Sequence, residues 1–136
     1  MRRSQQRRAA VFALYQHDVT GRPLDDVFDR DAHHFTRALA HATADNADEL
    51  DGHIARNAKG WTVTRIAPLE RAILRTALLE MLHPDLMEGE RPIPAEGAID
   101  EAVETAKAFC GAEAPGFVNG VLAAVLREAR SNGSAA

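Results

Sequence analysis

Residues 62–83 read TVTRIAPLERAILRTALLEMLH, and this stretch decides the fold. At about 100° per residue, its apolar side chains cover nearly the whole circumference of a helix, which Pro84 closes. These apolar positions are Ile66, Leu69, Ile73, Leu74, Ala77, Leu78, Met81 and Leu82. A helix that is apolar on every side needs neighbours on every side, so the sequence predicts a central helix over residues 62–83.

Two charged residues interrupt this apolar surface, because the helical wheel places Glu80 and Arg75 among the leucines and isoleucines. A charge in such surroundings is unfavourable unless a group of opposite sign contacts it. The sequence leaves two alternatives open: an internal ion pair, such as one between Glu80 and Arg75 themselves, or a contact with a partner protein.

The segments around the central helix also show helical spacing. The first predicted helix contains Val11, Leu14, Tyr15 and Val19 and stops at residues 20–23. Two or three helices follow over residues 24–58, with a break near 44–48. After the central helix come a helix over residues 94–109, with Phe109 on its inner face, and a last helix from about Phe117. The sequence therefore predicts a single all-α domain of six or seven helices over residues 1–130, followed by a flexible polar tail at residues 131–136.

Length, composition and charge narrow the class of protein. The chain has 136 residues and is 46% hydrophobic, which is enough for one core without disulfides or metals. Cys110 is its one cysteine, which excludes an internal disulfide and fits a reducing, cytoplasmic setting. The apolar runs are shorter than the ~18 residues of a membrane-spanning helix. Residues 1–22 carry a charge of +4 and the remainder −8, a pattern that suits a polyanion at one end and a basic protein elsewhere.

Four arginines crowd the start of the first helix, in RRSQQRRAAVFALYQ (residues 2–16), where the positive end of the helix dipole should repel them. Arg7 and Arg8 lie two turns upstream of Leu14 and Tyr15 on nearly the same stripe. We therefore expect the first two turns to project beyond the core or to stay loose until an anion orders them. Arginine and glutamine supply donors for phosphates and base edges, which favours nucleic acid over a solvated, frayed terminus.

The polar residues do not predict catalysis or metal binding. His34 and His41 stand seven residues apart and His33 and His41 eight apart, so the i, i+4 pair of a helical zinc motif is absent. The sequence also lacks a glycine-rich phosphate loop and a GxSxG elbow, and the aspartates of residues 25–31 are typical of a solvated acidic face. We expect no enzyme, no metal and no cofactor.

Four motifs, FALYQHDVTG, LERAILRTALLEML, AIDEAVETAKAF and FVNGVL, follow one another in the order and spacing of the NusB family of transcription antitermination factors. The resemblance covers roughly residues 3–127, and EAVETAKAF followed shortly by FVNGVL is its most specific part. It implies two packed helical bundles without enzymatic activity. Proteins of this kind bind the boxA element of nascent ribosomal RNA transcripts as a heterodimer with the ribosomal protein NusE. They reach the RNA polymerase elongation complex and the other Nus factors indirectly, through that assembly.

The resemblance also implies roles for individual residues. The RNA-binding candidates are Arg2, Arg3, Arg7, Arg8, Lys107, Phe117 and Asn119. The candidates for the protein partner are Tyr15, Glu70 and Glu80. Phe117 suits base stacking and Asn119 suits hydrogen bonding to a base edge, although a core anchor and a helix-terminal hydrogen bonder are equally consistent with their positions.

The chain departs from the family pattern at three places: Phe12 stands where glutamine is common, Asp100 replaces the usual asparagine, and GAEAPG lacks a basic residue before Phe117. We therefore expect weak RNA binding by the isolated protein, with a partner supplying much of the surface. Two rival functions are a purely protein-binding helical adapter and the NusB-like domain of a ribosomal RNA cytosine methyltransferase. The latter enzyme needs a cofactor-binding α/β domain, which these residues do not contain. The choice between monomer and homodimer stays open.

Overall fold

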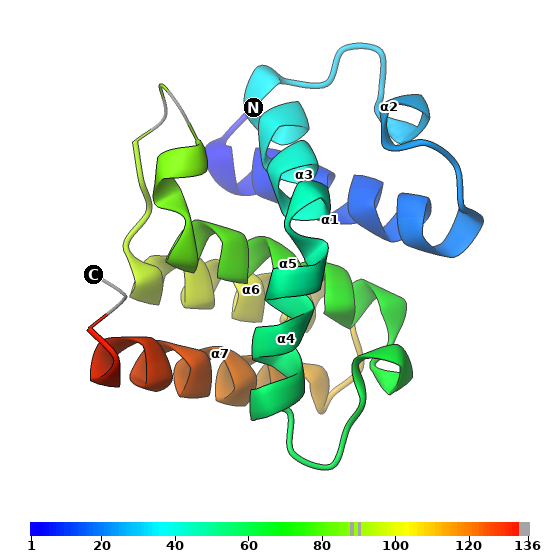
Figure 1. Ribbon diagram of the computed structural model, residues 1–136. Helices are drawn as coiled ribbons and strands as arrows, with labels where there is room; N and C mark the ends of the chain where they lie inside the picture. Colours follow the sequence, from blue (N-terminus) through cyan, green and yellow to red (C-terminus); the bar gives the residue numbers. More distant parts are fainter. Residues whose placement is uncertain (88, 90, 134–136) are drawn as a thin grey trace.

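The computed structural model describes residues 1–87, 89 and 91–133, and all regular structure in these residues is helical (Figure 1). The helices are α1 (Arg3–Thr20), α2 (Leu24–Val27), α3 (His34–Asp45), α4 (Ala47–Asn57), α5 (Pro68–Leu82), α6 (Ala95–Phe109) and α7 (Ala114–Ser131). Two short 3-10 turns, η1 (Val63–Arg65) and η2 (Pro84–Leu86), flank α5. The prediction of an all-α chain with six or seven helices is confirmed.

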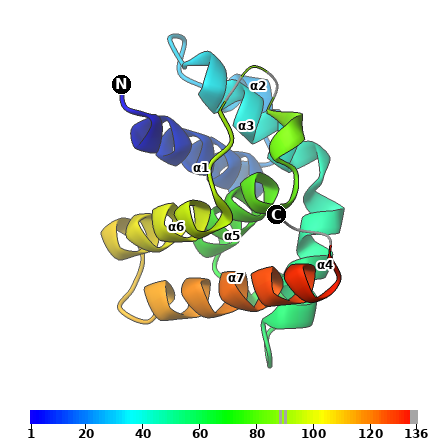
Figure 2. The ribbon, with the colours of Figure 1, turned by 90° about the vertical axis from the view of Figure 1, so that its left-hand side faces the viewer.

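Helix α5 is the centre of the molecule, as its sequence predicts. It packs against α1, α3, α4, α6 and α7, and the side chains of Leu74, Leu78 and Leu79 are fully buried. Helices α1–α3 form one group and α4, α6 and α7 the other, with α5 between them (Figures 1 and 2). This is the arrangement of two packed bundles.

The central helix begins later than predicted, at Pro68 instead of residue 62. Proline disfavours α-helical backbone at the residue before it, and Ala67 accordingly has extended dihedral angles, φ −55° and ψ 138°. Pro68 itself fits the first turn, where its missing N–H leaves no hydrogen bond unmade. Residues 63–65 instead form the 3-10 turn η1.

The last helix begins earlier than predicted, at Ala114 instead of near Phe117, because Pro115 suits its first turn. It continues to Ser131, so the predicted tail overlaps its end, and residues 134–136 lie outside the described part of the chain. Two further boundaries match the prediction. Helix α1 ends at Thr20, before Gly21, whose φ of 73° favours glycine, and Asn46 separates α3 from α4.

None of the helices in residues 1–87, 89 and 91–133 combines the length and the apolar character that crossing a bilayer requires.

The burial of α5 makes a quantitative prediction. Leu78→Ala should lower the free energy of unfolding by about 2–5 kcal/mol, because it opens a cavity at a fully buried position. Leu86→Ala removes the same atoms from a side chain that is 44% exposed, and should cost less than about 0.5 kcal/mol. Urea denaturation of both variants checks the pair, and equal losses would contradict the central position of α5.

Candidate nucleic-acid and partner-protein interface

The arginines at the start of α1 do not form one loose cluster. Helix α1 is already formed at Arg3, and the Arg7 Nε donates to both carboxylate oxygens of Glu80, at 2.8 and 3.2 Å. The side chains of Arg7 and Glu80 are only 12% and 7% exposed. The expectation that the first two turns project beyond the core is therefore wrong at Arg7, whose side chain is buried in an ion pair with a carboxylate from α5.

This ion pair also settles which internal partner Glu80 has. Glu80 contacts Arg7 on α1, while Arg75 donates to both carboxylate oxygens of Asp51 on α4, at 2.7 and 2.8 Å. The suggested pairing of Glu80 with Arg75 is wrong. Burial raises the pKa of the Glu80 carboxyl, and the hydrogen bond and charge of Arg7 offset only part of that effect. The geometry gives Arg7 and Glu80 a structural role, and their predicted contacts with RNA and with the protein partner stay predictions.

The glutamines of the first turn also have partners inside the chain. The Arg2 backbone N–H donates to Gln5 Oε1 at 3.0 Å, and Gln6 Nε2 donates to the Met1 carbonyl at 2.9 Å. These bonds hold the start of a helix whose arginines oppose its dipole. Arg3 lies with its guanidinium 4.0 Å from the centre of the Phe35 ring.

Arg8 faces a different surface from Arg7, although the two residues are neighbours in sequence. Its guanidinium lies 5.6 Å from the centre of the Phe109 ring, at the end of α6. The Arg8 Nε is buried and has no hydrogen-bond partner among the described residues. The side chain as a whole is half-buried, so a phosphate or a base from outside reaches the guanidinium through its terminal nitrogens, beside the Phe109 ring.

The prediction that Phe109 lies on the inner face of α6 is wrong, because this residue is 47% exposed. The ring of Phe12 on α1 contacts it edge-on, with centroids 4.9 Å apart and an interplanar angle of 86°. Phe12, one of the departures from the family pattern, thus helps to hold an exposed aromatic ring beside Arg8. We call Arg8, Phe12, Phe109 and the exposed Lys107 the α1–α6 surface. The sequence analysis missed both phenylalanines as site residues.

The other RNA-binding candidates lie around the end of α6 and the start of α7, which are adjacent in Figure 2. Lys107 is exposed and contacts Glu104, with Nζ 3.4 Å from Oε1. Asn119 is exposed on α7, whereas Phe117 is half-buried and faces Trp61, with ring centroids 6.2 Å apart. Phe117 therefore belongs to a second surface.

That second surface is a groove of about 380 Å³, which we call the Trp61–Phe117 groove. It is lined by Trp61, Arg65, Ile66, Ala67, Glu70, Glu113, Ala114 and Phe117. Trp61 is 51% exposed. Burial and the charge of Glu70 raise the pKa of the Cys110 thiol, which directly follows α6. The two carboxylates outnumber the one arginine of the lining, Arg65, and together with two aromatic rings they suit the side chains of a basic protein.

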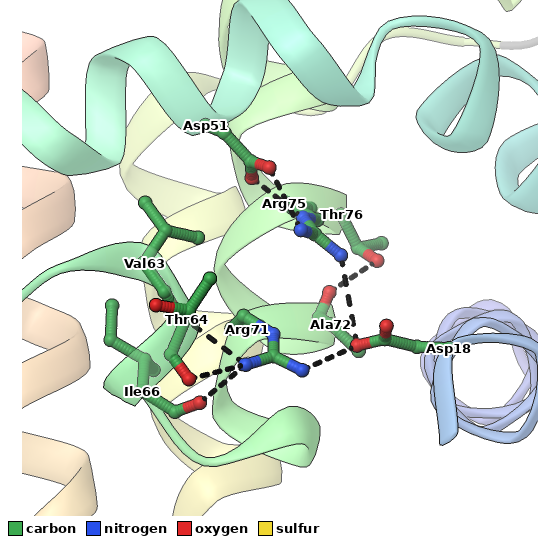
Figure 3. A network of polar contacts seen from close by, with 9 residues as sticks. All are labelled: Asp18, Asp51, Val63, Thr64, Ile66, Arg71, Ala72, Arg75 and Thr76. Carbon is green, nitrogen blue, oxygen red and sulfur yellow. Dashed lines mark hydrogen bonds and ion pairs between the residues drawn. The ribbon is translucent and has the colours of Figure 1, made fainter.

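The third candidate for the protein partner, Tyr15, is half-buried and packs against the core. One turn further along α1, Asp18 Oδ2 accepts a hydrogen bond from Arg71 Nη2 at 2.8 Å. This contact brings the second half of α1 beside the start of α5 (Figure 3). Glu70 lies in that first turn of α5.

Two of the histidines contact carboxylates of other segments. His41 Nε2 lies 2.6 Å from Asp25 Oδ1, and His83 Nε2 lies 2.8 Å from Glu49 Oε1. The part of the chain that the structure describes contains no group of three histidine, cysteine, aspartate or glutamate side chains able to hold a metal ion.

The fold and the two surfaces define a small all-helical binding protein, with aromatic rings presented beside arginines on one surface and beside carboxylates on the other. The chain belongs to the NusB family, whose model matches residues 4–127.

Individual relatives agree with this assignment. The transcription antitermination protein NusB of Rubrobacter xylanophilus is 38% identical over 128 residues, covering 90% of this chain and 88% of that protein. The protein of the same name from Halalkalibacterium halodurans is 39% identical over 132 residues, covering 93% and 94%. The structure of T. maritima NusB superimposes with a TM-score of 0.80 at 29% identity, covering 94% of this chain and 92% of that one.

A structure of antitermination factors NusB and NusE in complex with dsRNA contains a similar chain, with a TM-score of 0.75 at 23% identity. The superposition covers 94% of this chain and 99% of that one, and it shows that the two share a fold.

The buried ion pair predicts a large effect of truncation. Glu80→Ala should lower the free energy of unfolding by about 3–5 kcal/mol, because it leaves the Arg7 guanidinium buried without its counter-charge. The double variant Arg7→Met with Glu80→Leu should recover most of this loss, since it removes both charges. As a control, Glu96→Ala breaks an exposed ion pair with Arg130 and should have little effect. A Glu80→Ala protein as stable as wild type in urea would mean that the carboxylate serves a partner.

Proposed function

We propose that this chain is a transcription antitermination factor that binds the boxA RNA of nascent ribosomal RNA transcripts together with NusE. It acts without catalysis, on the RNA polymerase elongation complex in the bacterial cytoplasm and alongside other Nus factors. The observation that carries the proposal is the α1–α6 surface, where the Arg8 guanidinium and the exposed Phe109 ring lie together. The names of the relatives support the same function.

The α1–α6 surface supplies the two kinds of contact that single-stranded RNA uses. Arg8 and Lys107 offer charge to phosphates, and Phe109 offers a ring for base stacking. The exposed Arg2 and Arg3 add positive charge at the start of α1, with Arg3 on the side that faces Phe35. Asn119 is exposed on the neighbouring α7 and supplies a side-chain amide for a base edge.

The Trp61–Phe117 groove is the proposed site for NusE. Glu70 and Glu113 give it two carboxylates, and Trp61 and Phe117 give it aromatic faces for cationic side chains. Ribosomal proteins are basic because they bind RNA, and residues 23–136 of this chain carry a charge of −8. The charges of the two proteins therefore attract.

The RNA contact is tested by its salt dependence. Arg8→Ala should lower the slope of log K against log salt by about 0.7, the value for one lost phosphate contact on single-stranded RNA. Arg127→Ala removes the same charge from an exposed position near the far end of α7 and should leave the slope unchanged. Titrations of boxA RNA at several salt concentrations give both slopes. Equal slopes for Arg8→Ala and wild type would remove Arg8 from the interface.

The joint function predicts coupling between the two partners. Adding NusE should tighten boxA binding by about tenfold, or ~1.4 kcal/mol, and RNA should tighten the protein pair by the same factor. Fluorescence titration of labelled RNA with and without NusE measures the first factor, and calorimetry of the protein pair measures the second. Tight NusE binding with no RNA retention at any salt concentration would favour the rival function, a protein-binding adapter.

A further inference from the structure

Arg71 makes an unusual set of contacts for an arginine on a packed helix (Figure 3). Its Nη1 donates to the backbone carbonyls of Val63, Thr64 and Ile66, at 3.4, 3.3 and 2.9 Å. Its Nη2 donates to Asp18 Oδ2 on α1 at 2.8 Å. The side chain is only 14% exposed. One guanidinium therefore joins the segment before α5 to both α5 and α1.

The segment that Arg71 holds has mainly short-range hydrogen bonds of its own. The backbone N–H groups of Trp61, Arg65 and Ile66 each bond to a carbonyl three residues earlier, at 3.0–3.1 Å. Pro68 separates the segment from the hydrogen-bond ladder of α5. Short 3-10 turns have poorer hydrogen-bond geometry than α-helices, so this segment depends on contacts from outside.

The same segment forms one wall of the Trp61–Phe117 groove. Trp61, Arg65 and Ile66 come from it, while Glu113 directly precedes α7 and Phe117 lies in α7. The 6.2 Å separation of the Trp61 and Phe117 rings therefore depends on where the segment lies relative to α5 and α7.

We propose that Arg71 is a positioning residue for the Trp61–Phe117 groove: it fixes residues 61–66 against α5 and α1 and thereby sets the shape of the groove. Asp18 orients the guanidinium by accepting the Nη2 hydrogen bond. The inference rests on the proposed function only in that the groove is taken as the site for NusE. A preformed groove binds more tightly than a loose one, because less conformational entropy is lost on binding.

Arg75 provides a matched control one turn further along α5. It forms a two-point ion pair with Asp51 and also approaches Asp18, at 3.9 Å. Its exposure is similar, at 20%. Within the described part of the chain, the contacts of Arg75 run to these carboxylates and not to the carbonyls of residues 63–66. Loss of Arg75 should thus lower stability without loosening the groove.

The experiment compares Arg71→Gln with Arg75→Gln, both at a temperature well below their melting points. Trp61 is the one tryptophan of the chain, so time-resolved fluorescence anisotropy reports the local motion of this wall alone. The amplitude of fast depolarisation should rise in Arg71→Gln and match wild type in Arg75→Gln. The affinity for NusE should fall roughly tenfold, about 1.4 kcal/mol, in Arg71→Gln only.

A third variant keeps the test decisive if Arg71→Gln does not fold. Arg71→Lys retains the charge, but a single ammonium cannot reproduce the planar set of donors toward three carbonyls and a carboxylate. Arg71→Lys should raise the amplitude of fast depolarisation above that of wild type and weaken NusE binding, each by less than the effect expected for Arg71→Gln.

Each outcome bears on one of the two proposals. Equal depolarisation in the Arg71 and Arg75 variants overturns the positioning role, and so does increased depolarisation with unchanged NusE affinity. If wild type fails to bind NusE while Arg71→Gln still frees Trp61, the proposed function fails and the control of the groove wall by Arg71 stands.

Discussion

The structure depends on one constraint: α5 is surrounded by other helices, so a charge that lies at one of its helix contacts must be paired there. Glu70, in the first turn, instead lines the Trp61–Phe117 groove. Glu80 meets Arg7 on α1, Arg75 meets Asp51 on α4, and Arg71 meets Asp18 on α1. These pairs are directional, whereas the contacts of leucine and isoleucine are not. Apolar burial therefore supplies most of the stability, and the ion pairs fix how α1 and α4 are placed along α5.

The same constraint explains why the arginines of α1 differ in role. Arg7 and Arg8 are adjacent, but a helix turns by about 100° between them. One side chain therefore points at Glu80 and the other at Phe109. The sequence shows the charges but not this division, because Glu80 lies 73 residues away from Arg7 along the chain. A dipole argument alone treats both arginines as ligands for an anion.

Local patterns predicted the helices and the central place of α5, because helical periodicity and proline positions are properties of short segments. They failed where a distant element decides the result. Phe109 looked buried on the wheel of α6, yet α1 covers it only in part through Phe12. Trp61 gave no signal because it lies in a loop, and only the packing of α7 beside that loop creates a groove. Asn119 and Lys107 are exposed, but exposure alone does not identify what they bind.

The two proposed surfaces adjoin the same short connection between α6 and α7. Phe109 ends α6 on the α1–α6 surface, and Glu113 precedes α7 in the Trp61–Phe117 groove, so the residues between them link the two. Cys110 lies in this link, and burial and the charge of Glu70 in the groove raise the pKa of its thiol. A partner seated in the groove would contact the start of α7, a few residues along the chain from the Phe109 ring that ends α6. Coupling between RNA and protein binding therefore has a short path through this connection, which both surfaces share.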